Sequence, residues 1–430
     1  MFATLKNKIT ECGGEQFLYF SGISIASYAA ANVLFLGYSV YVASGIIGAL
    51  LVFLICSSLL YAASLSLLRV SVPRKLTSLD LVSHYFGAHG ARFCALVLAL
   101  TLLGWFLWQL SFCVHFVRDY AIVRMPIFKV LSEEKLGVAL GLFCCAVACS
   151  DKVGLRIVSV LFVPVLLFLL CCLFFFLSFY TPTHLAVLST IDFSTLSILF
   201  GSLTTLIMFS PTFFKSATSV DIARRSIKLT YLIILPLFYV SGVFFGMFSP
   251  SNNILNIAYL PSGIGPFVLT AFVLICGINI CSTNLLYGAD VITQVTSSKS
   301  RMPVVFMLSS VGVLFYGLVS SKVKADIVYI EFLGSLVMGM LSIILTKTIA
   351  SNFRIDKESL EQQRGNYLAL LVSYGVGLFV WTGVFHITGV PFFDVALSAF
   401  IMCLYYMRFP PKLRIFDWIR HKEWDRSSVH

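Results

Sequence analysis

The stretch FCALVLALTLLGWFLWQLSFCVHFV, residues 93–117, decides the fold class of this chain. It contains no Lys, Arg, Asp or Glu, and as an α-helix it is long enough to cross the roughly 30 Å hydrocarbon core of a bilayer. Comparable apolar stretches recur along the 430 residues, of which 59% are hydrophobic and only 11% charged. Runs of this length are typical of membrane helices and not of short alternating strands. We therefore predict an all-α integral membrane protein.

Hydropathy predicts about twelve membrane-spanning helices. They are expected at residues 17–37, 39–68, 93–117, 136–150, 155–180, 193–214, 229–248, 266–295, 302–320, 325–349, 367–387 and 390–407. If the N-terminus is cytoplasmic, 24 of the 30 Lys and Arg residues fall in cytoplasmic segments and 6 in external ones, the bias expected of cytoplasmic loops. We therefore predict a multi-pass protein of the cell (inner) membrane, with both terminal segments, 1–16 and 408–430, in the cytoplasm.

Two spans contain residues that commonly interrupt a membrane helix. The first span carries small and hydroxyl residues over 21–28, and the sixth carries GSLTT at 201–205, followed by Ser210 and Pro211. Proline removes a helical hydrogen bond, and an interrupted helix can turn backbone polar groups toward a cavity, so both segments suit a solute site near the midplane. The alternative is that these small residues only allow close helix packing.

The two segments lie five spans apart, which indicates an internal repeat. Corresponding interruptions in two halves of a membrane chain are typical of an inverted repeat. We predict five helices in residues 17–180 matched by five in 192–349, with two more helices at 366–407.

The third span carries an indole and an amide on one helical face, because Trp105 and Gln109 are four residues apart. An indole can stack on a flat ring, and an amide can both donate and accept hydrogen bonds, so the pair suits a heteroaromatic solute. Packing between helices is the alternative. We predict further substrate contacts at polar residues of the first, sixth and eighth spans, namely Ser24, Ser27, Tyr28, Ser202, Thr205 and Asn284.

The eighth span is rich in the oxygen ligands that a hard monovalent cation prefers. We predict a sodium site formed by Asn279, Ser282 and Thr283 next to Ala26 of the first span, and we expect no other metal. A purely structural hydrogen-bond network is the alternative. Asp290, near the inner end of the same span, is a candidate proton site, because an ionisable residue within a membrane helix is a functional candidate.

Several motifs resemble those of the nucleobase:cation symporter family, which includes cytosine permease and the hydantoin and allantoin transporters. The clearest are YFGAHGAR (85–92) and GWF (104–106). PTFFK (211–215) stands where that family has Pro-Asp-aromatic-Ser/Thr-Arg, with the acid lost and Lys in place of Arg. STN (282–284) and LYGA (286–289) are similar to its eighth helix.

The resemblance implies a five-plus-five inverted repeat of the leucine-transporter type, alternating access, and coupling to sodium or protons. In relatives with this Trp-x-x-x-Gln spacing, the pair stacks on and hydrogen-bonds the heterocycle, which carries over to Trp105 and Gln109. The family's sixth helix often supplies a second stacking aromatic residue, and this chain has none near Ser202.

We therefore expect a symporter that imports a nucleobase or a related small heterocycle. Its expected partners are the solute, a monovalent cation and membrane lipid, without nucleic acid, and we expect a monomer with no cofactor beyond the coupled Na⁺ or H⁺. An amino-acid carrier of the same fold is the alternative, because broken-helix dipoles could hold a carboxylate and an amine. A non-transport protein is less favoured, since the sequence lacks enzyme motifs such as His-Glu-x-x-His and no catalytic residue is expected.

Overall fold

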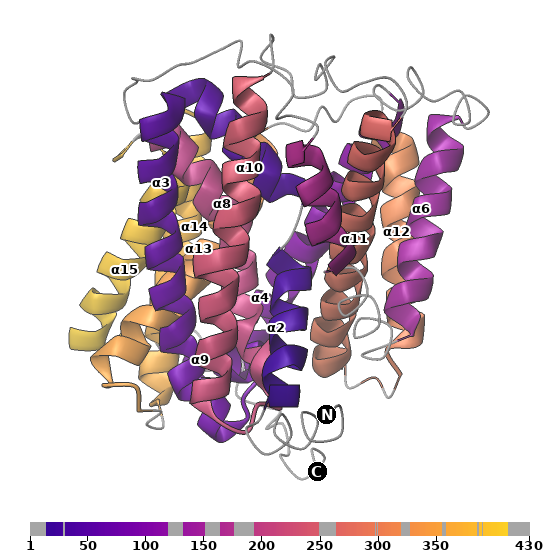
Figure 1. Cartoon of the computed structure of the whole chain (residues 1–430). Helices are drawn as coiled ribbons and strands as arrows, with labels where there is room; N and C mark the ends of the chain where they lie inside the picture. The colour runs from indigo at the N-terminus through magenta and orange to yellow at the C-terminus, as the bar shows by residue number, and fades with distance from the viewer. Residues whose placement is uncertain are drawn as a thin grey trace.

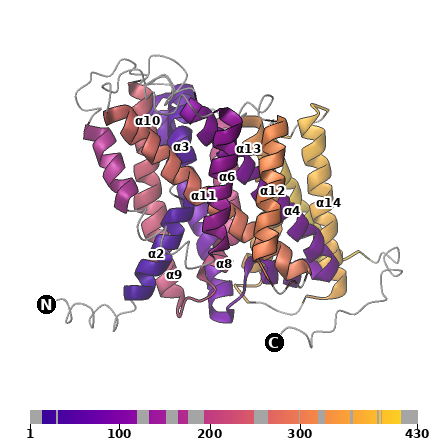
Figure 2. The ribbon, with the colours of Figure 1, turned by 90° about the vertical axis from the view of Figure 1, so that its right-hand side faces the viewer.

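The chain folds as a stack of membrane-length helices (Figures 1 and 2). The computed structural model describes residues 14–28, 31–118, 132–150, 164–175, 193–248, 264–296, 298, 300–319, 327–354, 358–384, 387–388 and 390–411. Within these ranges every regular element is helical. Most of the predicted terminal segments, 1–16 and 408–430, lie outside them.

The helices follow one another with short connections. In chain order they are α2 (Gly14–Tyr28), α3 (Ala31–Arg74), α4 (Ser78–Phe116), α6 (Glu133–Cys149), a helix at Pro164–Phe175, α8 (Phe193–Phe214), α9 (Val220–Leu229), the π-helix η3 (Thr230–Ile234), α10 (Leu235–Met247), α11 (Ile264–Thr296), α12 (Met302–Val319), α13 (Ile327–Ala350), α14 (Leu360–Trp381) and α15 (Pro391–Arg408). Among the described residues, six helical stretches are long and apolar enough to cross a membrane.

The first helices of the two predicted halves run in opposite directions. Phe20, near the start of α2, packs against Phe214 at the end of α8, with ring centroids 5.4 Å apart. The second helices are also opposed, because α3 ends where α9 begins. At the start of α9, Ser226 accepts a hydrogen bond from Ser21 of α2 at 3.2 Å. This antiparallel order is what an inverted repeat requires, while the exact limits of the halves remain a prediction.

Helices with corresponding places in the two halves pack side by side. α3 packs along α10, α4 along α11, and α6 along α12. We call α2, α3, α8, α9 and α10 the bundle helices, and α4, α6, α11 and α12 the scaffold helices. α13 packs against both groups, and α14 and α15 pack on each other beside it.

A glycine divides α3 into two helices. Gly45 has φ 64°, a conformation that residues with a Cβ rarely adopt, and it separates residues 31–44 from 46–74. The predicted boundary between the first two spans, at residues 37–39, is therefore wrong, because this segment is helical. The first span is instead built from α2 and residues 31–44.

A second glycine bends α4. Gly87 has φ 68°, so the predicted third span, 93–117, is preceded by a short helix that begins at Ser78. A capping box fixes that start: Thr77 N–H donates to the Asp80 carboxylate at 2.7 Å, and Asp80 N–H donates to the Thr77 hydroxyl at 3.1 Å. The YFGAHGAR motif thus forms a helix bend.

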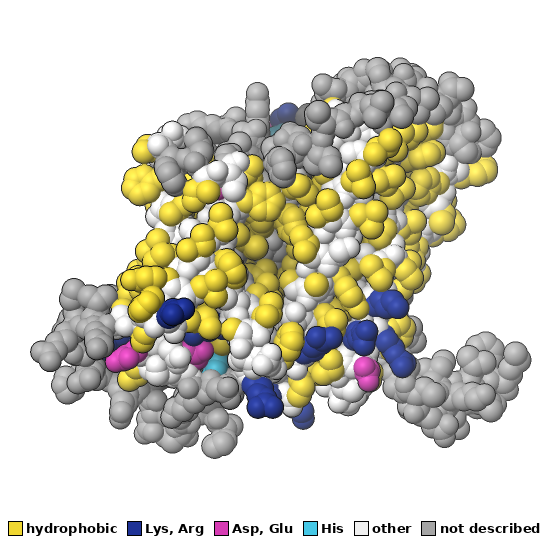
Figure 3. Space-filling model, turned by 90° about the vertical axis from the view of Figure 1, so that its left-hand side faces the viewer, with side chains coloured by type: hydrophobic (Ala, Val, Ile, Leu, Met, Phe, Trp, Pro, Cys, Tyr) yellow, Lys and Arg dark blue, Asp and Glu magenta, His cyan; other side chains and the backbone are white. Residues whose placement is uncertain are grey.

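Charged side chains gather at one end of the molecule (Figure 3). That end holds the C-terminus of α3 and the N-termini of α4 and α9, since Ser78 of α4 is hydrogen-bonded to Thr212 of α8. We call it the inner end and the opposite one the outer end. Between the two ends, apolar side chains such as Leu54, Phe168 and Leu314 are more than half exposed, as expected of a lipid-facing surface.

Candidate substrate and cation site

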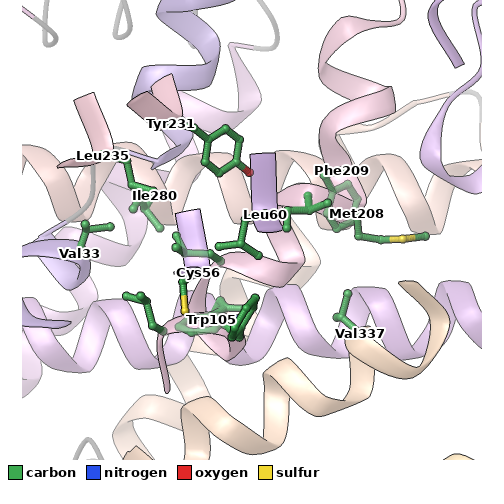
Figure 4. Close-up of a cluster of buried hydrophobic side chains, with 14 of the residues drawn as sticks. Val33, Cys56, Leu60, Trp105, Met208, Phe209, Tyr231, Leu235, Ile280 and Val337 are labelled. Carbon is green, nitrogen blue, oxygen red and sulfur yellow. The ribbon is translucent and has the colours of Figure 1, made fainter. Parts of the chain in front are cut away.

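Trp105 lies in the interior, where scaffold and bundle helices meet. Its side chain is only 5% exposed. Figure 4 shows it among apolar side chains of α3, α8, α11 and α13, including Cys56, Met208, Ile280 and Val337. The indole therefore packs against protein and does not point into lipid.

The third and sixth spans are joined at this point, as the predicted site requires. The indole Nε1 of Trp105 donates a hydrogen bond to the hydroxyl of Thr205, with the two atoms 3.2 Å apart. Thr205 is 3% exposed. Two predicted site residues from different spans are thus in direct contact.

Gln109 lies one helical turn further toward the outer end, beside α11. A Cβ on Gly277 would be 3.6 Å from the Gln109 Nε2, which itself reaches only the Cys113 sulfur, at 3.8 Å. The Gln109 side chain is 1% exposed, and its Oε1 has no hydrogen-bond partner among the described residues. Because an unpaired buried amide oxygen is costly, this atom is available to a ligand.

The same face of α4 continues outward as a series of aromatic rings. Trp108 meets Trp105 edge to face and stacks on Phe112, with centroid distances of 5.9 and 5.8 Å. Phe112 in turn contacts Phe35 of α3, with centroids 4.3 Å apart. Sequence reasoning missed Trp108, Phe112 and Phe35. The spacing of aromatic residues along this face was the only signal for the two on α4, and it equally fits packing.

The predicted interruption of the sixth span is wrong. α8 is continuous through residues 201–205 and contains Pro211. The hydroxyls of Ser202 and Thr204 bond to carbonyl groups three and four residues earlier in the same helix, so these polar groups are satisfied without a break.

Close packing explains the small residues of this segment. A Cβ on Gly334 of α13 would lie only 2.2 Å from the Cα of Gly201, so the two backbones approach each other directly at this point. The packing alternative considered for the sixth span is therefore correct for Gly201.

The first span is divided close to the predicted place. Residues 21–28 are helical, but α2 ends at Tyr28 and α3 begins at Ala31. Ser24 is fully buried, and its hydroxyl has no hydrogen-bond partner among the described residues. The side chains of Ala26, Ser27 and Tyr28 lie outside the described part of the structure, so their predicted contacts stay predictions.

The predicted cation residues of α11 are all buried. Asn279 and Ser282 have no exposed surface, and Thr283 is 4% exposed. The Thr283 hydroxyl donates to the Asn279 carbonyl at 2.8 Å, which leaves the oxygen's lone pairs for a cation. The Ser282 hydroxyl has no hydrogen-bond partner within the described residues. With α2 packed against α11, this donor set fits a monovalent cation.

Two further predicted residues of α11 lie nearer the inner end. Asn284 is 7% exposed, and its Nδ2 has no hydrogen-bond partner in the described ranges. Asp290 is also 7% exposed and forms an ion pair with Arg301, with the Arg Nε 2.6 Å from the carboxylate. The guanidinium balances the charge of this carboxylate, so Asp290 has a structural partner beside its predicted proton role.

A second aromatic contact closes the region toward the inner end. Phe213 of α8 lies against Tyr287 of α11, with centroids 4.7 Å apart, and Phe209 lies 5.9 Å from the same ring. One turn further, the hydroxyl and backbone N–H of Ser78 contact the Thr212 hydroxyl at 2.8 and 3.0 Å. Trp105 and Thr205 are thus enclosed between an outer and an inner contact of bundle with scaffold.

These features define a class: a multi-pass helical membrane protein with a closed polar site between two groups of helices. No protein-family model matches the sequence, and no curated protein matches it. Among solved structures, the chain is similar to Mhp1, a nucleobase-cation-symport-1 family transporter, in a closed conformation with bromovinylhydantoin bound. The TM-score is 0.71 at 15% identity, over 91% of this chain and 92% of that chain.

Two further structures are similar along most of their length. The inward-facing conformation of Mhp1 has a TM-score of 0.64 at 16% identity, over 91% of this chain and 90% of that one. A Na⁺-coupled sialic acid symporter in a substrate-bound outward-open state has a TM-score of 0.65 at 14% identity, over 91% and 89%. The chain therefore has the fold of these transporters, which confirms the predicted fold class, and it matches the closed form of Mhp1 better than the inward-facing form.

Proposed function

We propose that this chain is a cation-coupled symporter that imports a nucleobase or a related uncharged heterocycle by alternating access. One observation carries the proposal. Trp105 and Gln109 are buried on one face of α4 where scaffold and bundle meet, and the Gln109 Oε1 has no partner among the described residues. An aromatic ring and an open amide, side by side in the interior, suit a flat solute with polar edges.

The amide determines which polar edge it can bind. Gln109 Oε1 accepts hydrogen bonds, while Nε2, whose sulfur contact is weak, can donate them. A heterocycle with a carbonyl beside a ring N–H offers the complementary pair. The Mhp1 structure of the same fold holds a hydantoin, which is such a ring.

Charge favours this solute over an amino acid. Trp105, Gln109, Ser24 and Thr205 are all uncharged, and a zwitterion would need compensation for both of its charges in a low-dielectric interior. The amino-acid alternative relied on helix ends from two interrupted spans. Because α8 is continuous, the sixth span offers no such ends.

We place the coupled cation at Ser282 and Thr283, with Asn279 and the end of α2 around it, and we favour sodium. Hydroxyl oxygens are suitable ligands, and the sialic acid symporter of the same fold is Na⁺-coupled. Solute and cation would bind together from the outer side and leave together on the inner side, so that the sodium gradient drives uptake.

We further propose that the inner end faces the cytoplasm of a cell with both chain termini on that side. The gathering of Lys and Arg at this end supports that orientation (Figure 3). The proposed working form is a monomer surrounded by lipid, with no nucleic acid partner.

Thermal stabilisation of the purified protein tests the proposal. The panel would hold uracil, cytosine, adenine and hydantoin, against leucine, proline and alanine, each with sodium or potassium chloride. A true ligand raises the melting temperature by mass action, so we expect at least one heterocycle to do so, and more strongly in sodium. Stabilisation by an amino acid alone would contradict the proposed substrate class.

A matched pair of tryptophan variants locates the binding. Trp105→Ala should abolish the shift given by the active heterocycle, because the stacking ring is lost. Trp381→Ala, on α14 and away from α8 and α11, should retain it. A full shift in Trp105→Ala would remove the stacking role.

A further inference from the structure

The Trp105 indole has a single hydrogen-bond donor, and in this structure the protein already uses it. Nε1 lies 3.2 Å from the Thr205 hydroxyl oxygen, and both side chains are at least 95% buried. A solute could therefore meet the face of the indole without competing for its N–H. The bond also fixes the ring plane, since it restrains the side chain at its far edge.

Thr205 differs from its polar neighbours on α8. Ser202 and Thr204 donate their hydroxyl protons to carbonyls of their own helix. Thr205 instead accepts a hydrogen bond from another helix. Its position half-way between the inner and outer aromatic contacts places that bond beside the proposed solute.

The bond also joins two groups of helices. Trp105 belongs to α4, which packs along α11 of the scaffold, whereas Thr205 belongs to α8, which packs along α3 of the bundle. If these groups move relative to each other during transport, a bond of this length can be made only when they are together.

We propose that Thr205 is a positioning residue: it holds the Trp105 indole in the orientation that presents its face to the solute, and it does so only while α8 lies against α4. The solute's hydrogen bonds are then left to Gln109. This assignment replaces the direct substrate contact predicted for Thr205, and it rests on the proposed function for its binding consequence alone.

The hydrogen bond can be tested without any ligand. In protein labelled with ¹⁵N at its five Trp residues, Trp105→Phe identifies the indole resonance of Trp105 by its loss. Thr205→Val removes the acceptor at nearly constant volume, so that resonance should shift upfield. Thr205→Ser should retain the original position, and so should the control Thr204→Val, whose hydroxyl bonds within α8. An unchanged Trp105 resonance in Thr205→Val would overturn the proposal.

The binding consequence needs a second measurement. With uracil and hydantoin as probes, Thr205→Val should weaken binding by about threefold to tenfold, as expected for loss of one neutral hydrogen bond, and Thr205→Ser should restore it. In a Trp105→Phe background, which keeps a ring but lacks the N–H, Thr205→Val should have no further effect.

The two arms fail independently. If neither probe binds the wild-type protein, the substrate class is wrong, and the indole resonance still decides whether Thr205 positions Trp105. If the probes bind and Thr205→Val weakens binding equally in the wild-type and Trp105→Phe backgrounds, Thr205 acts without Trp105 and the positioning role is refuted.

Discussion

Phe35 and Phe112 meet edge to face, with ring centroids 4.3 Å apart, on the outer side of Trp105. Phe35 lies in the outer helix of the first span, and Phe112 belongs to α4, so the contact joins bundle to scaffold. Because Phe112 also stacks on Trp108, the contact is continuous with the aromatic series that begins at Trp105. A solute entering from outside would have to separate these two rings.

The first prediction follows from that contact. Phe35→Ala and Phe112→Ala should each speed the release of a bound, radiolabelled heterocycle several-fold, since an aromatic pair contributes about 0.5–1.5 kcal/mol beyond its buried area. The double variant should release it little faster than either single one. Phe93→Ala, which alters an aromatic contact of α4 with Tyr367 of α14 instead, is the matched control. Fully additive effects would show that the two rings do not act as one closure.

The inner end gives a second prediction. Thr212 accepts a hydrogen bond from the backbone N–H of Ser78 and shares a second with its hydroxyl. Thr212→Val should release the start of α4 and lower the protection of its first amides against hydrogen exchange by up to about tenfold. Thr212→Ser should preserve it. If Val and Ser variants exchange alike, the hydroxyl does not hold this end closed.

The position of Thr212 shows how a sequence motif can be informative although its key residue has changed. In the family motif an acid stands here, and its loss in PTFFK left the segment without an evident role. In the structure, the Thr212 hydroxyl serves the N-terminus of α4, a place where a carboxylate would also be favourable. The local function can thus survive the substitution, and only the tertiary contact with Ser78 reveals it.

Other parts of the site were accessible to sequence reasoning to different degrees. The pairing of α4 with α8 at Trp105 and Thr205 could be predicted, because both segments carry polar residues at mid-span. The continuity of α8 could not. Hydroxyl residues can satisfy themselves within a helix or line a break, and the choice is made by Gly334, which is distant in sequence.

The helix boundaries show the same limit. Hydropathy placed a division at residues 37–39, where a glycine and a serine lie, whereas the chain turns at Gly45. Glycine is compatible with a helix as well as with positive φ, so composition alone cannot tell which one carries the bend.

The third prediction concerns the cation. Sodium chloride should stabilise the wild-type protein against heat more than potassium chloride at equal ionic strength, because only the fitting ion binds the folded state. Ser282→Ala should remove this difference, since it deletes a buried hydroxyl with no hydrogen-bond partner in the described residues. Ser309→Ala is the control, as Ser309 is similarly buried but bonds the Gly141 carbonyl at 3.3 Å. A sodium effect that persists in Ser282→Ala would move the cation site elsewhere.

The last prediction concerns the bend at Gly87, which lies close to two carbonyl groups of α4. Asn366 Nδ2 donates to the Tyr85 carbonyl at 2.7 Å, and Gln363 Nε2 donates to the His84 carbonyl at 3.2 Å, both from α14. The Asn366 side chain is 1% exposed.

Asn366→Ala should therefore lower stability by about 1–2 kcal/mol, because it removes a buried hydrogen bond and leaves a small cavity. Gln363→Ala, at a half-buried position, should cost less, and the order of the two melting temperatures checks this. If Asn366→Ala melts with the wild type, α14 packs against the bend without stabilising it. If it melts lower, the two C-terminal helices support the scaffold helix that carries Trp105 and Gln109.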